Sequence, residues 1–329
     1  MQVQERVDAH TRRTRPFPAP EVLALAALAA VVVRPHVARY FESPALRNWV
    51  TVFLAIVVQA LPFLVFGVVL SGAIAAFVRE EWLSRALPKD PRLAVGVAGL
   101  AGAALPGCEC GAVPVAGRLV ARGAPAPAAL AFLLSAPAIN PVVVVSTAVA
   151  FPARPAMVAA RFVASLATSV VVGLIWTRIG REDWVARARR YTPHSTGRFA
   201  VFAETAHHDF LHAGGFLVVG GLTAATLQTV VPRSVLDTVG SSGALSVATM
   251  AFLAIVLAIC SEADAFVAAG MFQFSLASRL VFLVVGPTVD IKLIALQAGT
   301  FGRDFAMRFA PLTLGVAIVT SLIVAKVLL

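Results

Sequence analysis

Charged residues are scarce in this chain. Lys, Arg, Asp and Glu make up 13% of the 329 residues, which is about half of their share in soluble domains, and 59% of the residues are hydrophobic. This composition excludes an ordinary soluble protein and predicts an all-α integral membrane protein. The net charge of +10 does not indicate a nucleic-acid partner, because the arginines concentrate between apolar segments, as the positive-inside rule expects.

Cysteine is also scarce, and the motifs of common enzymes are absent. Cys108, Cys110 and Cys260 each lie in an apolar segment, and three cysteines exclude a closed disulfide framework. The sequence has no Walker motif, no Gly-x-Ser-x-Gly and no His-Glu-x-x-His. Any transport is therefore not powered by ATP hydrolysis within this chain. We expect a protein that is not an enzyme and that holds neither a cofactor nor a resident metal.

One apolar stretch, residues 105–141, contains many helix breakers. They gather near its two ends: Pro106, Gly107, Gly111, Pro114, Pro137 and Pro141. A broken backbone at membrane depth is tolerated only where it is packed in protein or lines a cavity. We therefore predict two discontinuous helices that face each other, with Cys108, Glu109 and Cys110 at one break and Asn140 at the other.

The same pattern returns 150 residues later. Three pairs share this offset: Cys110 with Cys260, Pro137 with Pro287, and Asn140 with Asp290. We predict an internal duplication that brings the two cysteines, the asparagine and the aspartate together at mid-membrane. Duplicated halves with breaks at matching positions indicate a transporter site at the interface between the repeats.

The order of apolar and polar segments predicts four regions. Residues 1–46 form an N-terminal tail with a short apolar helix at 19–33, and no signal-peptide cleavage site stands out. Residues 47–180 form a first membrane repeat, residues 181–198 a basic cytoplasmic loop, and residues 199–329 a second membrane repeat, with about eight or nine transmembrane helices in all. Four spans in each half would make the halves parallel, whereas re-entrant hairpins would allow inverted halves. The sequence leaves both arrangements open.

Ionisable residues interrupt the apolar runs. They are Glu109, Glu262, Asp264, Asp290 and Lys292. Such groups are costly at membrane depth and mark substrate or proton paths. The alternative is internal pairing, with Lys292 neutralising one carboxylate. Because acids outnumber bases here, at least one acid is expected to be protonated or to face a cation or water.

The cysteine pair suggests chemistry with soft ions. Cys108 and Cys110 would point to nearly opposite sides of a regular helix, so they converge on one ligand only if the backbone is unwound. Thiolates prefer soft, thiophilic ions, although a cysteine can also be a small buried hydrophobe. A second candidate, Glu204 with His208 and His212, shares one helix face and could bind a transition metal. A solvated interfacial face is the interpretation that we favour for it.

Three motifs together resemble those of a known family. They are Cys-Glu-Cys-Gly-Ala-Val-Pro at 108–114, Ala-Pro-Ala-Ile-Asn-Pro at 136–141 and Cys-Ser-Glu-Ala-Asp-Ala-Phe at 260–266. Over about residues 48–329 the chain resembles a bacterial predicted-permease family that includes the organoarsenical efflux permeases, which export trivalent methylated or aromatic arsenic. Many relatives have serine between the paired cysteines, where this chain has Glu109.

The motifs and the resemblance lead to one functional hypothesis. We predict a secondary-active, proton-coupled permease of the bacterial inner membrane that exports a small solute, such as a trivalent organoarsenical or another thiophilic species. The cysteines would bind the substrate and the acids would couple it to protons. The residues assigned to substrate binding are Cys108, Glu109, Cys110, Gly111, Pro114, Pro137, Asn140, Pro141, Cys260, Glu262, Asp264, Pro287, Asp290 and Lys292.

Two other functions fit the sequence less well. A membrane-embedded thiol oxidoreductase could use the Cys108/Cys110 pair, and it would need a quinone or a thioredoxin-like partner. Cysteines two residues apart form a strained disulfide ring, which disfavours this reading. The acids inside the apolar segments argue against a scaffold subunit that transports nothing. The partners expected on the favoured hypothesis are the lipid bilayer and a small-molecule substrate.

Overall fold

The computed structural model describes residues 43–79, 82, 85, 87–105, 107–190, 193, 195, 197–230 and 243–329. The short apolar helix predicted at 19–33 lies outside these residues. The chain divides into two compact units, residues 1–48 and residues 49–329.

The described residues fold into helices, and no strand occurs among them. The helices are α2 (Pro44–Phe77), α4 (Pro91–Ala101), the short 3-10 helix η3 (Gly102–Ala104), α5 (Glu109–Ala121), α6 (Ala126–Ile139), α7 (Pro141–Ala150), α8 (Pro155–Ile179), α9 (Glu182–Arg190), α10 (Arg198–Val230), α12 (Gly243–Leu257), α13 (Asp264–Gly270), α14 (Leu276–Thr288), α15 (Ile291–Thr300) and α16 (Arg303–Leu328).

Within the part of the chain that the structure describes, six helical segments are long and apolar enough to cross a membrane. They are α2, α6 with α7, α8, α10, α14 with α15, and α16, and two shorter apolar helices, α4 with η3 and α12, join them. This arrangement confirms the prediction of an all-α, multi-pass membrane protein. It also places one short and three long apolar segments in each half of the chain.

The first predicted break lies at the tip of a hairpin. Ala94 of α4 packs with Ala128 at the start of α6, and Gly102 lies against Ser135 near the end of α6, so α4 and α6 are parallel. Only residues 122–125 connect α5 to α6, which makes α5 antiparallel to α6. The segment from α4 to α5 therefore folds back on itself instead of crossing as one helix.

The second half contains a matching hairpin. The Ser246 hydroxyl at the start of α12 donates to the Ser278 hydroxyl at the start of α14 (2.9 Å). At the far end, Asp264 lies beside Gly286 of α14, and α13 then returns toward the start of α14. Cys260 lies in the turn between α12 and α13. The two predicted cysteine sites are thus the tips of two hairpins, which we call the first tip (residues 105–110) and the second tip (residues 258–263).

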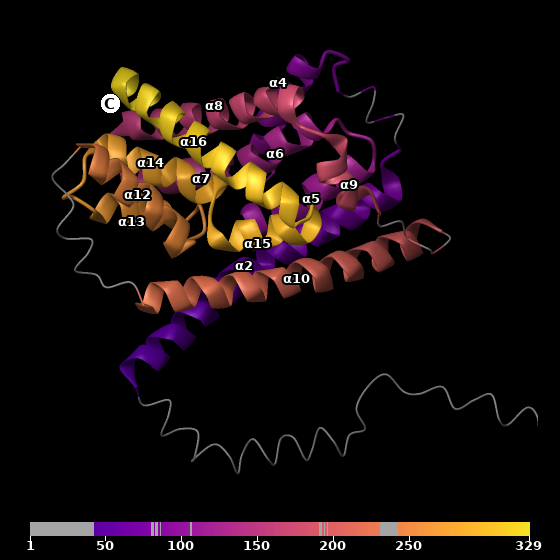
Figure 1. Ribbon diagram of the computed structural model, residues 1–329, viewed down its shortest axis with the longest axis horizontal. Coiled ribbons are helices and arrows are strands. Elements are labelled where there is room, and N and C mark those ends of the chain that lie inside the picture. Colours follow the sequence, from indigo (N-terminus) through magenta and orange to yellow (C-terminus); the bar gives the residue numbers. More distant parts are fainter. Residues whose placement is uncertain are drawn as a thin grey trace, which may run out of the picture. The chain divides into compact units, whose positions relative to one another are not determined.

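Helices at matching places in the two halves run antiparallel. Trp176 near the end of α8 packs edge-on against Phe305 near the start of α16 (ring centroids 5.4 Å apart). Thr168 and Thr320, in the middle of the same helices, share a hydrogen bond of 2.7 Å. In Figure 1, α8 runs across the upper part of the molecule, and α16 packs against it and runs diagonally down from the upper left.

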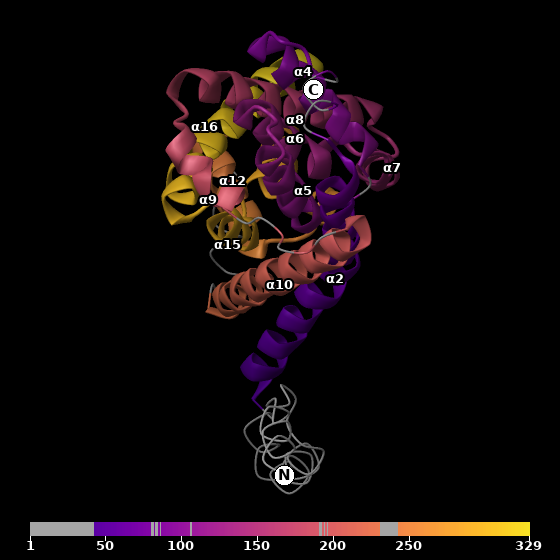
Figure 2. The same cartoon turned by 90° about the vertical axis from the view of Figure 1, so that its right-hand side faces the viewer.

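The long helices α2 and α10 form a second antiparallel pair. The Phe77 ring meets the Phe199 ring at the end of α2 and the start of α10 (6.2 Å between centroids). The indole of Trp49 donates to the Thr226 hydroxyl at the opposite end (3.0 Å). Both ribbon views show α10 alongside α2 (Figures 1 and 2).

The prolines do not themselves mark the breaks. Pro114, Pro137 and Pro287 lie inside α5, α6 and α14, although we expected them to interrupt these helices. A proline inside a helix removes one backbone hydrogen bond, and tight packing around these segments tolerates that loss. Pro141 is the first residue of α7, where the missing N–H has no helical partner in any case. The backbone breaks instead at residues 105 and 107–108, at Asn140 and at residues 289–290.

The predicted basic loop at 181–198 contains a helix. α9 packs against α5 and α16, with Val185 fully buried. Its Trp184 ring meets Trp176 of α8 (5.7 Å between centroids), and the Arg308 guanidinium lies 4.7 Å above the Trp184 ring centroid. The segment predicted as a loop is therefore a short amphipathic helix held by aromatic contacts.

Candidate substrate site

The two hairpin tips bring sulfur and oxygen ligands together. One ligand atom each from Cys108, Glu109 and Cys260 lies within 4.8 Å of the others, and all three residues are buried. Among the residues that the structure describes, this is the one group of three histidines, cysteines or acids close enough to hold an ion. The cluster joins the first tip to the second, so it exists only because the halves meet.

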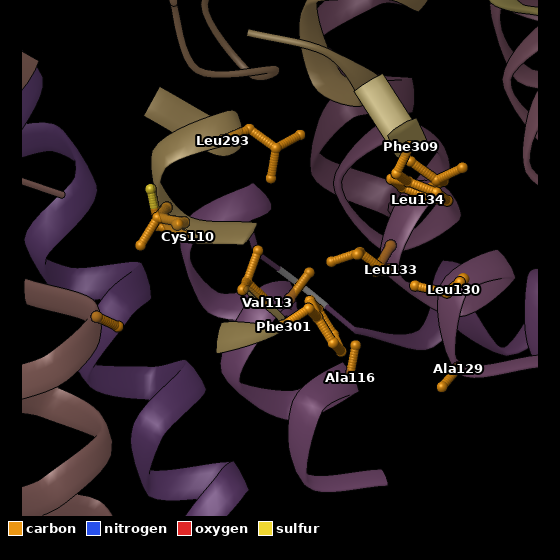
Figure 3. Packing of buried hydrophobic residues seen from close by; sticks show 14 of the residues in the cluster. Cys110, Val113, Ala116, Ala129, Leu130, Leu133, Leu134, Leu293, Phe301 and Phe309 are labelled. Atoms are coloured by element: carbon orange, nitrogen blue, oxygen red, sulfur yellow. The ribbon is translucent and has the colours of Figure 1, made fainter. Parts of the chain in front are cut away.

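The local backbone explains why Cys108 and Cys110 converge. Cys108 caps α5 in an extended conformation (φ −88°, ψ 178°), and the helix begins at Glu109. The Cys108 side chain therefore leaves the helical path and reaches the thiols of both Cys110 and Cys260. Cys110 lies in the first turn of α5 and packs in the same cluster as Leu293 of α15, as Figure 3 shows. All three cysteines are free thiols and are buried.

Lys292 supplies the positive charge at the tips. Its ammonium pairs with the Glu109 carboxylate and lies 3.7 Å from the Asp290 carboxylate. It also lies 3.8 Å from the Cys260 sulfur. Two buried acids therefore share one buried cation, so this group carries an excess of negative charge when both acids are ionised.

Asn140 and Asp290 stabilise the two helix breaks in the same way. Asn140 caps α7 by accepting from Val143 N–H (3.0 Å), and Asp290 caps α15 by accepting from Leu293 N–H (2.5 Å). The Asn140 amide also donates to the Gly107 carbonyl of the first tip (3.0 Å). The structure thus places Asn140 and Asp290 beside the cysteine cluster, as the shared offset predicts.

Asp264 is engaged by an arginine that the sequence analysis did not assign to the site. Arg161 of α8 donates to the Asp264 carboxylate (2.8 Å) and to the Ser261 carbonyl (3.0 Å). It also donates to Thr147 of α7 (2.9 Å), and the arginine and the aspartate are both buried. This network fixes the second tip to the first half of the chain. An arginine inside the apolar run 157–179 was the signal that could have identified it.

Glu262 occupies a different environment in the second tip. Its side chain is partly buried, and neither carboxylate oxygen has a hydrogen-bond partner among the described residues. It lies within electrostatic range of Glu109, Lys292 and Arg161. Of the predicted acids, it is the one most available to a proton or a cation that enters the site.

Gly111 serves close helix packing. A Cβ atom at Gly111 would lie 2.7 Å from the Phe63 carbonyl oxygen of α2, and one at Gly67 would lie 2.4 Å from the Gly111 Cα atom. Only glycine permits α2 and α5 to approach this closely. Pro137 and Pro287 lie within the helices that lead to the two breaks. They therefore contribute to the site by shaping the backbone before each break.

A second polar group lies about two to three turns along α5 from the cysteines. Arg118 of α5 donates to both carboxylate oxygens of Asp209 on α10 (2.9 and 3.0 Å). The Ser71 hydroxyl of α2 donates to the same carboxylate (2.5 Å). The sequence analysis missed this cluster, which joins three helices, although Arg118 interrupts an apolar run in the same way as Arg161.

The Glu204, His208 and His212 group does not form a metal site. The Glu204 carboxylate accepts from the Ser195 N–H (2.9 Å), and the three residues do not form one of the candidate ion-binding groups among the described residues. The two imidazole rings stack 5.7 Å apart and face a cavity of about 420 Å³. The lining of this cavity is considered below.

Comparison with known proteins agrees with this architecture. The profile of a family described as "Predicted permease" matches residues 45–326. The chain belongs to this permease family. The permease is 36% identical to the UPF0718 protein YcgR of Bacillus subtilis, over 83% of this chain and 96% of the relative. It is 30% identical to a Streptococcus mutans protein named "Putative two-component membrane permease complex subunit", over 83% of this chain and 93% of the relative.

The family and the fold support the same coarse function. No solved structure gives a significant match to the permease. The helical segments and the family together identify a multi-pass bacterial membrane protein, and the permease family points to a role in transport.

Proposed function

We propose that this permease is a secondary-active exporter of a soft, thiophilic solute, with a trivalent organoarsenical as the best candidate. The observation that carries the proposal is the approach of Cys108, Glu109 and Cys260 to within 4.8 Å at the meeting point of the two tips. Thiolates are the ligands that soft ions prefer, and carboxylates suit harder ions. Two sulfurs from separate hairpins therefore favour a soft substrate that bridges them.

The binding chemistry balances without an oxidant. A monoorgano arsenic(III) species with two hydroxyl groups would exchange both with the thiols of Cys108 and Cys260. Two As–S bonds form, two As–O bonds break, and the thiol protons leave with the hydroxyls as two water molecules. Because the As–C bond occupies the third position, Cys110 is a neighbour of the ligand and not a required bond.

The charged residues supply the coupling to protons. Glu109 is adjacent in sequence to Cys108 and pairs with Lys292, so it can take the proton of a thiol that becomes a ligand and pass it to the departing hydroxyl, which leaves as water. Glu262 has no hydrogen-bond partner among the described residues and lies between this group and the Arg161 network. We assign proton transfer to Glu109 and Glu262, and the positioning of Glu109 to Lys292.

We further infer that the two halves arose by duplication and are inverted relative to each other. The 150-residue offset relates the breaks, and α8 with α16 and α2 with α10 are antiparallel pairs at matching places. If the pseudo-twofold axis that relates the two halves ran along the membrane normal, equivalent helices would be parallel to each other. The two hairpins then enter from opposite membrane faces, which is suited to alternating access around a fixed central site.

The geometry disfavours the thiol oxidoreductase. Cysteines that exchange disulfides with partner proteins are at least partly exposed, whereas Cys108 and Cys110 are fully buried. Bridging of Cys108 to Cys110 would also remove the thiol that reaches Cys260.

Transport in everted membrane vesicles tests the proposal. Cys108→Ser and Cys260→Ser should each abolish ATP-independent uptake of phenylarsine oxide, because each removes one of the two sulfur bonds. Cys110→Ser is the matched control and should retain most of the uptake. A triple serine variant that transports at the wild-type rate, at equal expression, would show that the thiols only fill space.

A further inference from the structure

A polar cavity opens toward the cysteine cluster from one end of the helices. It has a volume of about 420 Å³, and its walls come from α5, α9, α10 and α15. We call this cavity the vestibule. Pro114, on its inner wall, lies four residues along α5 from Cys110, and four residues correspond to about one helical turn. The vestibule therefore ends about one turn from the buried thiols.

The vestibule offers positive charge and hydrogen-bond donors. Arg187 of α9 lines it together with His208 and His212, and it forms no ion pair with any residue that the structure describes. Asp209 of α10, which is partly buried, is paired with Arg118 and also lies 3.2 Å from the His208 ring. The positive charge of the vestibule therefore comes from Arg187, and the two imidazoles add polar groups to its wall.

The vestibule opens on the face where basic residues gather. Among the described residues of the unit 49–329, the helix ends and short connections on this face carry Arg79, Arg85, Lys89, Arg92, Arg122, Arg178, Arg181, Arg187, Arg198, Arg303 and Arg308, and the opposite ends of the same bundle carry Arg154, Arg279 and Lys326. The positive-inside rule assigns the more basic face to the cytoplasm. A soft ion in the cytoplasm meets a pool of small thiols, and adducts with carboxylate-bearing thiols are anions.

From these observations, and on the basis of the function proposed above, we propose that the vestibule binds the substrate as an anionic adduct with a carboxylate-bearing small thiol. Arg187 and the two imidazoles recognise the carboxylates of the carrier. The substrate then passes by thiol exchange to the two tips. For arsenic(III), two As–S bonds to the carrier break, two As–S bonds to Cys108 and Cys260 form, and the cysteine protons leave on the released carrier thiols.

A binding experiment tests the vestibule without using transport. The probe is radiolabelled S-methylglutathione, which carries the carboxylates but has no free thiol, and binding to the purified full-length permease is measured by equilibrium dialysis. Arg187→Gln should weaken binding at least about tenfold, since a charge-assisted hydrogen bond is lost. The matched control is Arg178→Gln, an exposed arginine of the same face that lines a different cavity, and it should leave binding unchanged. The triple cysteine-to-serine variant should also bind normally.

A transport arm identifies the carrier and separates the two proposals. In everted vesicles, Arg187→Gln should slow uptake of phenylarsine oxide offered with glutathione and leave uptake of the uncharged 2-mercaptoethanol adduct unchanged. If the wild type and Arg187→Gln bound the probe equally well, the vestibule proposal would be wrong. It would also be wrong if inorganic phosphate displaced the radiolabelled probe as effectively as unlabelled S-methylglutathione does. Arg187-dependent binding without arsenical transport by the wild type would support the anion site and refute the arsenical substrate.

Discussion

The two hairpin regions share a backbone plan and differ in their chemistry. In the first, the break after α6 is capped by neutral Asn140, and the tip carries two cysteines. In the second, the break after α14 is capped by Asp290, Lys292 follows, and the tip carries Cys260 alone. The position 150 residues before Lys292 is Val142, which is exposed. The first region thus contributes most of the sulfur and the second most of the charge.

This division shows how two halves with a similar backbone plan can build a site that neither half contains. Glu109, the acid of the first tip, takes its counter-ion from the second half. Asp264, the acid at the start of α13, takes its counter-ion, Arg161, from the first half. Each half therefore holds a buried charge that is neutralised only when the halves meet, and the predictions below test that dependence.

The largest effect on stability is expected from breaking the Arg161–Asp264 pair. The first half has no equivalent pair, because the position 150 residues before Asp264 is Pro114, which has no charge. Arg161→Met should lower the free energy of unfolding by about 3 to 5 kcal/mol, since it leaves a buried carboxylate unpaired. Denaturation of the purified protein by SDS, followed by circular dichroism, measures the loss. The double variant Arg161→Met/Asp264→Leu should recover much of it. A double variant no more stable than the single one would contradict this account.

Exchanging the two caps tests whether their difference matters. Asn140→Asp places a carboxylate against the Gly107 and Ala136 carbonyls, where the amide now donates, and should destabilise the fold by about 2 to 3 kcal/mol. Asp290→Asn keeps the cap on Leu293 and leaves Lys292 paired with Glu109, so its effect should stay below about 1 kcal/mol. The same SDS titration compares them. Equal losses in the two variants would mean that the halves are electrostatically alike.

A smaller effect should be shared by both halves. Gly67 brings α2 onto α5 and Gly220 brings α10 onto α15, and in each case an added Cβ would lie within 3 Å of the facing backbone, at 2.4 Å and 2.8 Å respectively. Gly67→Ala and Gly220→Ala should each cost about 1 to 3 kcal/mol through overpacking. Gly315→Ala is the control, because nothing lies within 4 Å of its added Cβ. A large loss in only one of the two variants would show that the halves pack differently at these crossings.

The sequence predicts the long helices well because each is a continuous apolar run with clear ends. The apolar run 128–151 corresponds to α6 with α7, and the apolar run 157–179 corresponds closely to α8. The gathering of the cysteines with Asn140 and Asp290 also follows from the sequence, because the 150-residue offset encodes it. The composition indicated that Lys292 could pair with a buried carboxylate, but it did not identify Glu109 as its main partner.

Other features could not be predicted from one sequence. Apolar periodicity says nothing about direction, so the return of α5 alongside α4 depends on contacts such as that between Gly102 and Ser135. The helix α9 reads as a loop because its charged residues dominate its composition, and only its packing on α5 reveals the buried Val185. The partners of Arg161 and Arg118 lie 103 and 91 residues away in the chain, beyond any local pattern.

On the function proposed above, the placement of Cys108 and Cys260 on separate hairpins sets a limit on how tightly this permease can hold a thiophilic solute. A solute bonded to both sulfurs fastens the two tips together, and the tips must separate for release. A longer residence time of the solute on the two sulfurs therefore means a lower rate of transport. A compound that bridges both thiols and offers no group for a competing thiol to displace would lock the permease closed, so the strongest ligand of this site should be an inhibitor and not a substrate.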